Sequence, residues 1–155
     1  MELYETKKEA QNVLLVTVDT GEFDADLSLQ ELKELTKTAG AIVKSTVKQK
    51  RDKPDTATYV GSGMLESIKE FSKNNDINLI IFDSELTPSQ IRNIENYTNI
   101  RVIDRTMLIL DIFASNARSK EGKLQVELAQ LKYMLPRLTG KGVQMSRLGG
   151  GIGTR

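Results

Sequence analysis

Short apolar segments of strand length alternate with helix-length amphipathic stretches in the first 103 residues, and this alternation constrains the fold more than any other feature. The expected strands cover residues 12–19, 41–48, 57–60, 77–82 and 100–103. The run at 77–82 is the most apolar, which is typical of a central strand covered on both faces. Strands alternating with helices favour βαβ units. The sequence therefore predicts an α/β fold with a mostly parallel sheet of four to five strands flanked by helices.

Signals for helix starts and stops support this alternation. Ser28 followed by Glu31 has the spacing of a capping box and predicts a helix start, and Gly40 is a plausible stop for that helix. Thr87, with proline next and Gln90 three residues on, predicts a second well-capped start.

The character of the chain changes after Asp104. Residues 107–117 form an apolar helical segment that Ser119 caps or bends. Leucines then recur at spacings of four and three residues, which is typical of a helix packed along another helix. We call this row the leucine seam, and its members are Leu124, Leu128, Leu131, Leu135 and Leu138.

Composition removes several classes of chemistry. The chain has no Cys and no His, which excludes disulfides, thiolate or imidazole metal sites and a Ser-His-Asp triad. No run of 18 apolar residues is present, so no membrane span is expected. The N-terminus lacks a basic start followed by an apolar stretch, so we expect a cytoplasmic protein.

Positive charge and glycine gather at the C-terminal end. Residues 101–155 carry 10 Lys and Arg against 4 Asp and Glu, although the whole chain has a formal net charge of +1. Six of the 11 glycines lie between residues 140 and 153. A basic end of this kind favours a polyanionic partner, with a solvated basic face as the alternative. The glycine-rich loop itself suits either close approach to another backbone or a flexible linker.

Catalytic signals are weak. The turn at residues 61–63 could hold an anion at a helix N-terminus, but Glu66 stands where a dinucleotide fingerprint needs glycine. Asp83 and Glu85 follow an apolar strand and could act as a general acid and base. The favoured interpretation is that they only flank the start of the next helix. Asp104 and Asp111 flank or interrupt the apolar helix and are expected to pair with Arg105. We assign no catalytic residue and no metal ligand.

Several long motifs resemble the N-terminal domain of HflX-type translational GTPases. They are YVGSG at residues 59–63, DRT at 104–106, LILDIFA at 108–114, EGKLQVELAQL at 121–131, LPRL at 135–138 and SRLGGGIGTR at 146–155. The matches cover essentially the whole chain. One departure is Met64, where the family often has Lys, so a phosphate role for the preceding turn is not carried over.

The resemblance implies a bacterial, stress-related factor that binds the large (50S) ribosomal subunit and splits stalled or idle ribosomes with GTP. It implies an α/β subdomain over residues 1–103 and, over 104–155, the first half of an antiparallel helical arm. The arm's first helix would span 119–138. The basic loop at 139–155 would reach toward the peptidyl transferase centre. The second arm helix and a GTPase domain that binds GTP and Mg²⁺ would follow residue 155, so no cofactor is expected in this chain.

Three hypotheses for the function follow. The third is a small-molecule enzyme that uses Asp83 and the turn at 61–63. In the first, a basic tip contacts 23S ribosomal RNA. Its cations are Lys141, Arg147 and Arg155, with Arg118, Lys120, Lys123 and Arg137 as secondary contacts. Gly149, Gly150, Gly151 and Gly153 would make the loop thin. In the second, the leucine seam docks a partner helix and regulates the GTPase domain, or mediates self-association of this chain.

Overall fold

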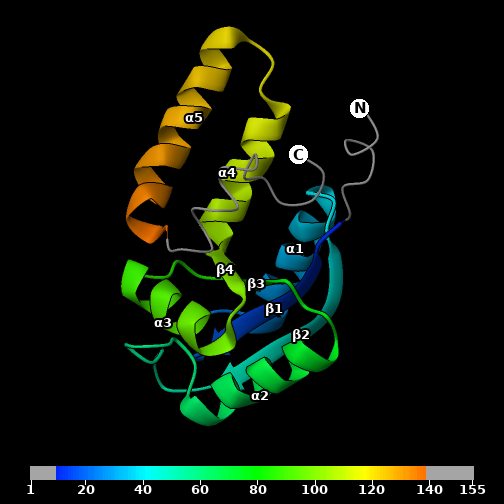
Figure 1. Ribbon diagram of the computed structural model, residues 1–155, viewed down its shortest axis with the longest axis vertical. Coiled ribbons are helices and arrows are strands. Elements are labelled where there is room, and N and C mark those ends of the chain that lie inside the picture. The colour runs from blue at the N-terminus through cyan, green and yellow to red at the C-terminus, as the bar shows by residue number, and fades with distance from the viewer. Residues whose placement is uncertain (1–9, 139–155) are drawn as a thin grey trace.

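A four-stranded, fully parallel sheet forms the centre of the computed structural model, which describes residues 10–138 (Figure 1). Its strands are β1 (Asn12–Asp19), β2 (Ile42–Lys50), β3 (Leu79–Phe82) and β4 (Arg101–Asp104), in the spatial order β2-β1-β3-β4. All three neighbouring pairs are parallel, so the predicted α/β fold is confirmed.

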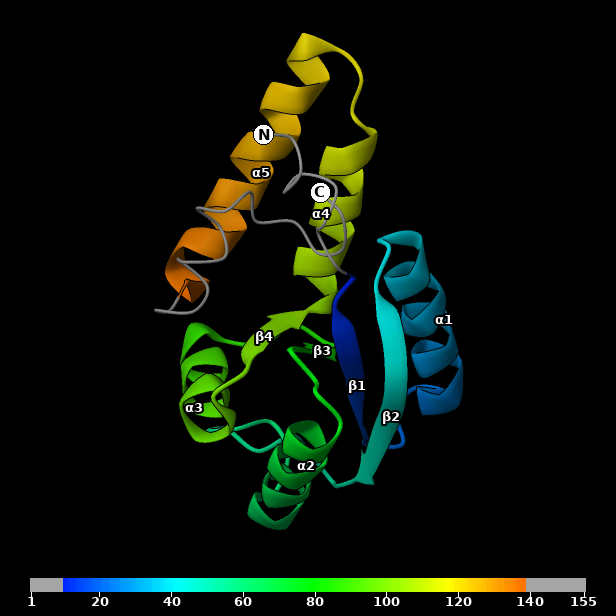
Figure 2. The same ribbon diagram turned by 45° about the vertical axis from the view of Figure 1, so that its right-hand side comes forward.

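Five α-helices connect and extend this sheet. Their bounds are α1 (Ala25–Thr38), α2 (Ser62–Asn74), α3 (Pro88–Thr98), α4 (Arg105–Asn116) and α5 (Lys120–Met134). Helix α1 covers one face of the sheet and α2 and α3 cover the other (Figure 2). None of the helices within residues 10–138 is both long and apolar enough to cross a lipid bilayer.

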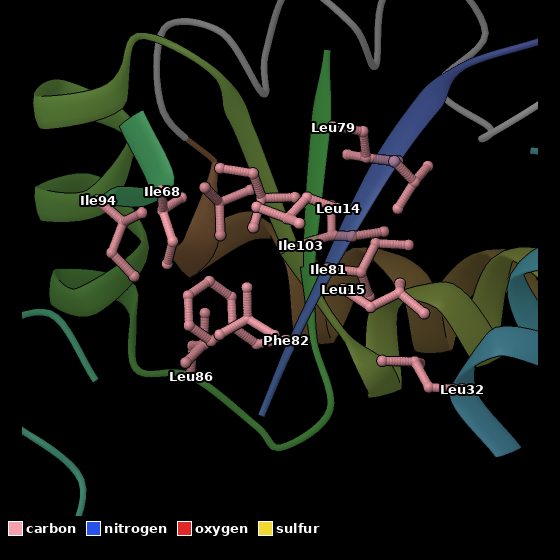
Figure 3. Close-up of a cluster of buried hydrophobic side chains, with 14 of the residues drawn as sticks. Leu14, Leu15, Leu32, Ile68, Leu79, Ile81, Phe82, Leu86, Ile94 and Ile103 are labelled. Atoms are coloured by element: carbon pink, nitrogen blue, oxygen red, sulfur yellow. The ribbon is translucent and has the colours of Figure 1, made fainter. Parts of the chain in front are cut away.

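The hydrophobic core lies on both faces of β1 and β3. Leu15 and Ile81 are paired in register and lie on the α1 side with Leu32, whereas Phe82 and Ile68 lie toward α2 and α3 (Figure 3). All five side chains are fully buried, which explains why these strands read as continuous apolar runs in the sequence.

The predicted second helix start is confirmed, and the first is wrong. The Thr87 hydroxyl accepts a hydrogen bond from the Gln90 N–H, and the Gln90 side-chain oxygen accepts one from the Thr87 N–H. Helix α3 therefore begins with a capping box. Helix α1 begins at Ala25, because Asp24 accepts the hydrogen bond from the Leu27 N–H at 3.0 Å. The Ser28 hydroxyl instead donates a hydrogen bond to the carboxylate of Asp83, which lies 55 residues away in the sequence.

The strand expected at residues 57–60 is absent from this part of the described chain. Asp55 and Tyr59 exchange two backbone hydrogen bonds, and the Asp55 carboxylate accepts the N–H groups of Ala57 and Thr58. These backbone hydrogen bonds also lower the pKa of Asp55. The side chain of Asp55 therefore folds the segment into a closed turn, and Tyr59 takes a left-handed conformation with φ of 66°.

Candidate functional site

Helices α4 and α5 form an antiparallel hairpin that leaves the sheet at the end of β4 (Figures 1 and 2). The turn between them, residues 117–119, lies at the end of the hairpin farthest from the sheet. Ser119 accepts the Gly122 N–H at 2.9 Å and so begins α5, whereas it was expected to cap or bend the apolar helix before it. The side chains of the turn therefore lie well away from the sheet and the helices that cover it.

Three of the predicted RNA contacts lie together around this turn. Arg118, Lys120 and Lys123 are all exposed, and none forms an ion pair with another described residue. Glu121 is the one acidic side chain among them, so residues 117–123 carry an excess of positive charge. We call these three cations the basic turn. An exposed cluster of unpaired cations is the arrangement that binds phosphate groups.

The leucine seam lies on the face of α5 that is turned away from the body. Leu124, Leu128, Leu131 and Leu135 keep 61%, 54%, 52% and 60% of their surface exposed, and Leu138 is half-buried. The half-buried residues of α5 fall two places later, at Val126, Gln130 and Tyr133, where they face α4 and the body. A helix that covers the seam is thus not found among residues 10–138.

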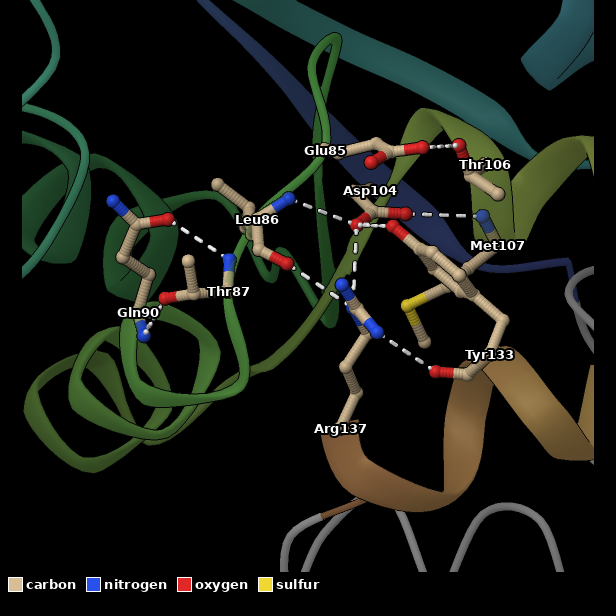
Figure 4. Close-up of polar contacts among 9 residues, drawn as sticks. All are labelled: Glu85, Leu86, Thr87, Gln90, Asp104, Thr106, Met107, Tyr133 and Arg137. Carbon is tan, nitrogen blue, oxygen red and sulfur yellow. Dashed lines mark hydrogen bonds and ion pairs between the residues drawn. The ribbon is translucent and has the colours of Figure 1, made fainter.

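The end of α5 is fastened to the body by a group of polar contacts that we call the clamp (Figure 4). Its centre is Asp104, whose side chain is fully buried at the end of β4. The Asp104 carboxylate accepts the Leu86 N–H at 3.0 Å, the Met107 N–H at 3.0 Å and the Tyr133 hydroxyl at 2.7 Å. Burial, followed by this contact with Asp104, raises the pKa of the Tyr133 hydroxyl far above its ordinary value.

Arg137 completes the clamp from the 3-10 turn Leu135–Arg137. Its Nε donates to the Leu86 carbonyl at 3.1 Å and lies 3.9 Å from the Asp104 carboxylate, and its Nη1 donates to the Tyr133 carbonyl at 3.0 Å. The guanidinium also stacks on the Tyr133 ring at 3.8 Å. Arg137 was predicted as a secondary RNA contact, but its guanidinium is engaged with the body.

The other predicted RNA contacts fall outside the described residues. These are Lys141, Arg147 and Arg155, together with the loop glycines Gly149, Gly150, Gly151 and Gly153.

The carboxyl edge of the sheet holds the residues considered for catalysis. The Asp83 carboxylate is buried and accepts the hydroxyls of Thr17 and Ser28 at 2.5 and 2.7 Å. Glu85 accepts the Thr106 hydroxyl at 3.2 Å. The Gly61 N–H, at the turn before α2, donates to the Gln49 side chain. Each of these groups thus links two segments that are separate in the sequence.

The charged groups near the start of α4 pair differently from the expectation. Arg105 contacts α1 and not the expected Asp104 or Asp111. Its Nη2 lies 3.4 Å from the Glu31 carboxylate on α1. Asp111 is buried near Arg101, whose pKa is lowered by burial and raised in part by Glu95 and Asp111. Within residues 10–138 no cluster of three or more His, Cys, Asp or Glu could hold a metal ion.

Sequence reasoning missed the clamp. A signal was present, because Val126, Gln130, Tyr133 and Arg137 repeat the four- and three-residue spacing of the leucines two places later. Two stripes of equal period on one helix mean that only one can face the body, and the polar stripe does so here. Nothing in the sequence around Asp104 indicated that it contacts Tyr133 and Arg137, which lie 29 and 33 residues later.

Comparison with known proteins finds the chain similar to part of several GTP-binding proteins. A family model described as "GTP-binding GTPase N-terminal" matches residues 26–114, and one described as "GTP-binding GTPase Middle Region" matches residues 116–155. The chain is 52% identical over 151 residues to a protein named GTPase HflX from Caldanaerobacter subterraneus subsp. tengcongensis, covering 97% of this chain and 35% of that protein. It is 44% identical over 133 residues to GTPase HflX of Escherichia coli, covering 85% and 31%.

Solved structures give the same picture. The crystal structure of SsGBP in complex with GDP matches with a TM-score of 0.66 and 30% identity, covering 86% of this chain and 38% of that chain. A GTP-binding protein of Sulfolobus solfataricus in complex with GDP matches with a TM-score of 0.62 and 29% identity, covering 89% and 40%. The chain spans about a third of the length of the curated relatives named above.

Proposed function

This chain belongs to the HflX family of GTPases and matches the N-terminal part of its members, and from this premise we propose that it is a ribosome-binding module. It binds 23S ribosomal RNA of the large (50S) subunit, and the longer protein splits stalled or idle ribosomes in the cytoplasm. In that protein a GTPase domain supplies GTP hydrolysis with Mg²⁺. We assign residues 1–103 to the α/β body and 104–155 to the arm, since Asp104 both ends β4 and caps α4.

The basic turn is the observation that supports this proposal. Arg118, Lys120 and Lys123 are exposed, unpaired with other described residues and held at the far end of a two-helix projection. An RNA backbone is a dense row of phosphates, and cations displayed in this way neutralise phosphates and release counterions. Lys141, Arg147 and Arg155 are proposed to add to them from the loop at 139–155. Arg137 is assigned to the clamp instead.

Salt dependence tests the proposal. If about five cations neutralise phosphates, log affinity should fall against log salt with a slope near −3.5, which is roughly a 100-fold loss between 50 and 200 mM salt. The variant R118A/K120A/K123A should reduce the slope by about 2 units. The measurement is co-sedimentation or filter binding of the 155-residue chain with 50S subunits across a salt series.

A matched control removes the same charge elsewhere. Lys44, Lys53 and Lys73 are exposed on β2, on the loop after it and on α2. Their triple alanine variant should keep the wild-type slope. If both triple variants flatten the slope equally, the attraction is unspecific. An unchanged slope in the basic-turn variant would remove that turn from the RNA contacts.

The exposed leucine seam supports a second candidate function. Four leucines with more than half of their surface exposed form an apolar stripe that no other helix within residues 10–138 covers. In this reading the seam docks a helix or the GTPase domain of the longer protein and regulates it. Apolar docking is insensitive to salt, so L128E/L131E should weaken this association while leaving the salt slope of RNA binding unchanged. RNA binding that disappears together with the seam would contradict the separation of the two roles.

A further inference from the structure

The clamp is the main attachment of α5 to the body beyond its contact with α4. Helix α5 has no buried residue. A cleft of about 660 Å³ separates the hairpin from the end of α1, with Thr38, Ala39 and Gly40 on one side and Lys123, Glu127 and Gln130 on the other. Helix α4 is anchored by its buried residues Met107 and Leu108. Because the cleft keeps the middle of α5 away from the body, the position of α5 depends on its contact with α4 and on its own end, where Tyr133 and Arg137 lie.

The chemistry of the clamp favours a single geometry. A fully buried carboxylate is costly to leave unsatisfied, and hydrogen bonds to a charged group are stronger than those between neutral groups. Asp104 gathers its donors from three segments, namely the loop before α3, the start of α4 and the end of α5. Arg137 contacts the same three segments, through the Leu86 carbonyl, the Tyr133 carbonyl and the Asp104 carboxylate. Loss of one donor from α5 therefore loosens the helix against both other segments.

The clamp also sits where a small rotation has a large effect. Helix α5 has 15 residues, so its axis is roughly 22 Å long. A tilt of about 10° at the clamp would move the basic turn by roughly 4 Å, more than the length of a hydrogen bond. Arg137 also lies two residues before the segment 139–155, which carries Lys141, Arg147 and Arg155. The basic turn thus takes its position in part from this point.

We propose that Tyr133 and Arg137 are positioning residues that fix the direction of the arm through Asp104 and so hold its basic residues in register with the RNA. The binding consequence rests on the proposed function, whereas the fixed direction of the arm does not. Neither side chain contacts RNA. A neutral change at Tyr133 should therefore weaken binding as much as a charge change at Arg137.

The first experiment measures the direction of the arm without RNA. The chain has no Cys, so Glu121→Cys, beside Lys120 of the basic turn, and Lys73→Cys on α2 provide two sites for spin labels. The distance distribution between the labels should be narrow in the otherwise unchanged protein. It should broaden or shift by several ångströms in Tyr133→Phe, which removes one hydroxyl, and in Arg137→Gln. Lys132→Gln removes an exposed neighbouring charge and should leave the distribution unchanged.

The second experiment measures binding to 50S subunits across a salt series with the unlabelled variants. Tyr133→Phe and Arg137→Gln should each lower affinity about 5- to 10-fold with the salt slope unchanged, and the double variant should be no weaker than the weaker single variant. If Arg137→Gln instead lowers the slope by about 0.7 while Tyr133→Phe binds normally, Arg137 is a direct contact and the proposal fails.

The two experiments separate the inference from the proposed function. An unchanged label distance in both Tyr133→Phe and Arg137→Gln overturns the clamp, whatever the RNA result. A broadened distance in a protein whose wild type does not bind 50S subunits supports the clamp and contradicts the proposed function. A variant is taken as folded if its far-ultraviolet circular dichroism is unchanged and its urea unfolding midpoint stays well above zero. Tyr133→Phe is the milder of the two variants for this comparison.

Discussion

Replacing Leu128 and Leu131 by glutamate should abolish self-association of the 155-residue chain. The seam presents four leucines whose exposed fractions lie between 52% and 61%. Burying one leucine completely contributes roughly 1.5–3 kcal/mol, so covering the exposed half contributes roughly 0.8–1.5 kcal/mol. The simplest cover is the seam of a second copy in a two-fold pair. Four leucines on each of two copies then contribute roughly 6–12 kcal/mol.

Association itself costs about 4–15 kcal/mol in lost translational and rotational freedom, which removes much of this gain. With the mid-range gain of about 9 kcal/mol and the smallest cost of about 4 kcal/mol, a remainder of about 5 kcal/mol corresponds to a dissociation constant of roughly 0.2 mM. We therefore expect a weak dimer that is populated at high protein concentration and absent at a few micromolar.

Sedimentation equilibrium or light scattering across a concentration series measures this association. The wild type should approach the mass of two copies, and L128E/L131E should remain at the mass of one with its α/β body folded. A control on the opposite face, Gln130→Glu, adds charge to the stripe that faces α4 and the body and leaves the seam unchanged. A wild type that remains monomeric at millimolar concentration, with the amides of α5 protected from exchange, would refute the argument.

Four other outcomes are expected. Thr87→Ala should lower the free energy of unfolding by about 1 kcal/mol in urea melts, because the Gln90 N–H loses its cap. Ile81→Ala should lower it by about 2–5 kcal/mol, because Ile81 is fully buried between α1 and the sheet. The raised pKa of Tyr133 makes its contribution to stability complete below about pH 10 and progressively lost above it, as the unfolded chain releases the proton first. Tyr133→Phe should therefore flatten the fall of urea midpoints between pH 9 and 11, leaving the part that comes from Tyr59, whose pKa is also raised by burial. The chain should not hydrolyse GTP, since it lacks a Gly-x-x-x-x-Gly-Lys-Ser/Thr loop, and phosphate release that survives repurification would contradict this.

Local chemistry made much of the fold predictable. The capping box at Thr87 depends on residues three places apart, so the sequence shows it directly. The start of α1 was misplaced because the Ser28 hydroxyl is used by Asp83, a partner 55 residues away. The strand expected at 57–60 failed because one carboxylate, Asp55, satisfies nearby backbone donors and closes a turn.

The site was only partly predictable for the same reason. Periodicity indicated that α5 carries an apolar seam, but it did not indicate which of two equally spaced stripes faces the body. That choice follows from Asp104, whose buried charge needs the Tyr133 hydroxyl and the Arg137 guanidinium. The cations of the basic turn were named only as secondary RNA contacts, which stays a prediction, and their display at the end of a hairpin required the structure.

The central position of β1 has a consequence for the order in which this chain acquires its fold during synthesis. β1 is made first, yet one of its two edges stays unpaired until β3 appears, and the Thr17–Asp83 contact joins residues 66 apart. Closing so long a loop costs entropy before any pairing rewards it, which slows the folding of parallel sheets. Until β3 has been made, that free edge of Asn12–Asp19 can pair with other chains. The body is therefore open to mispairing at this edge for that interval, whereas the α4–α5 hairpin closes locally and fast.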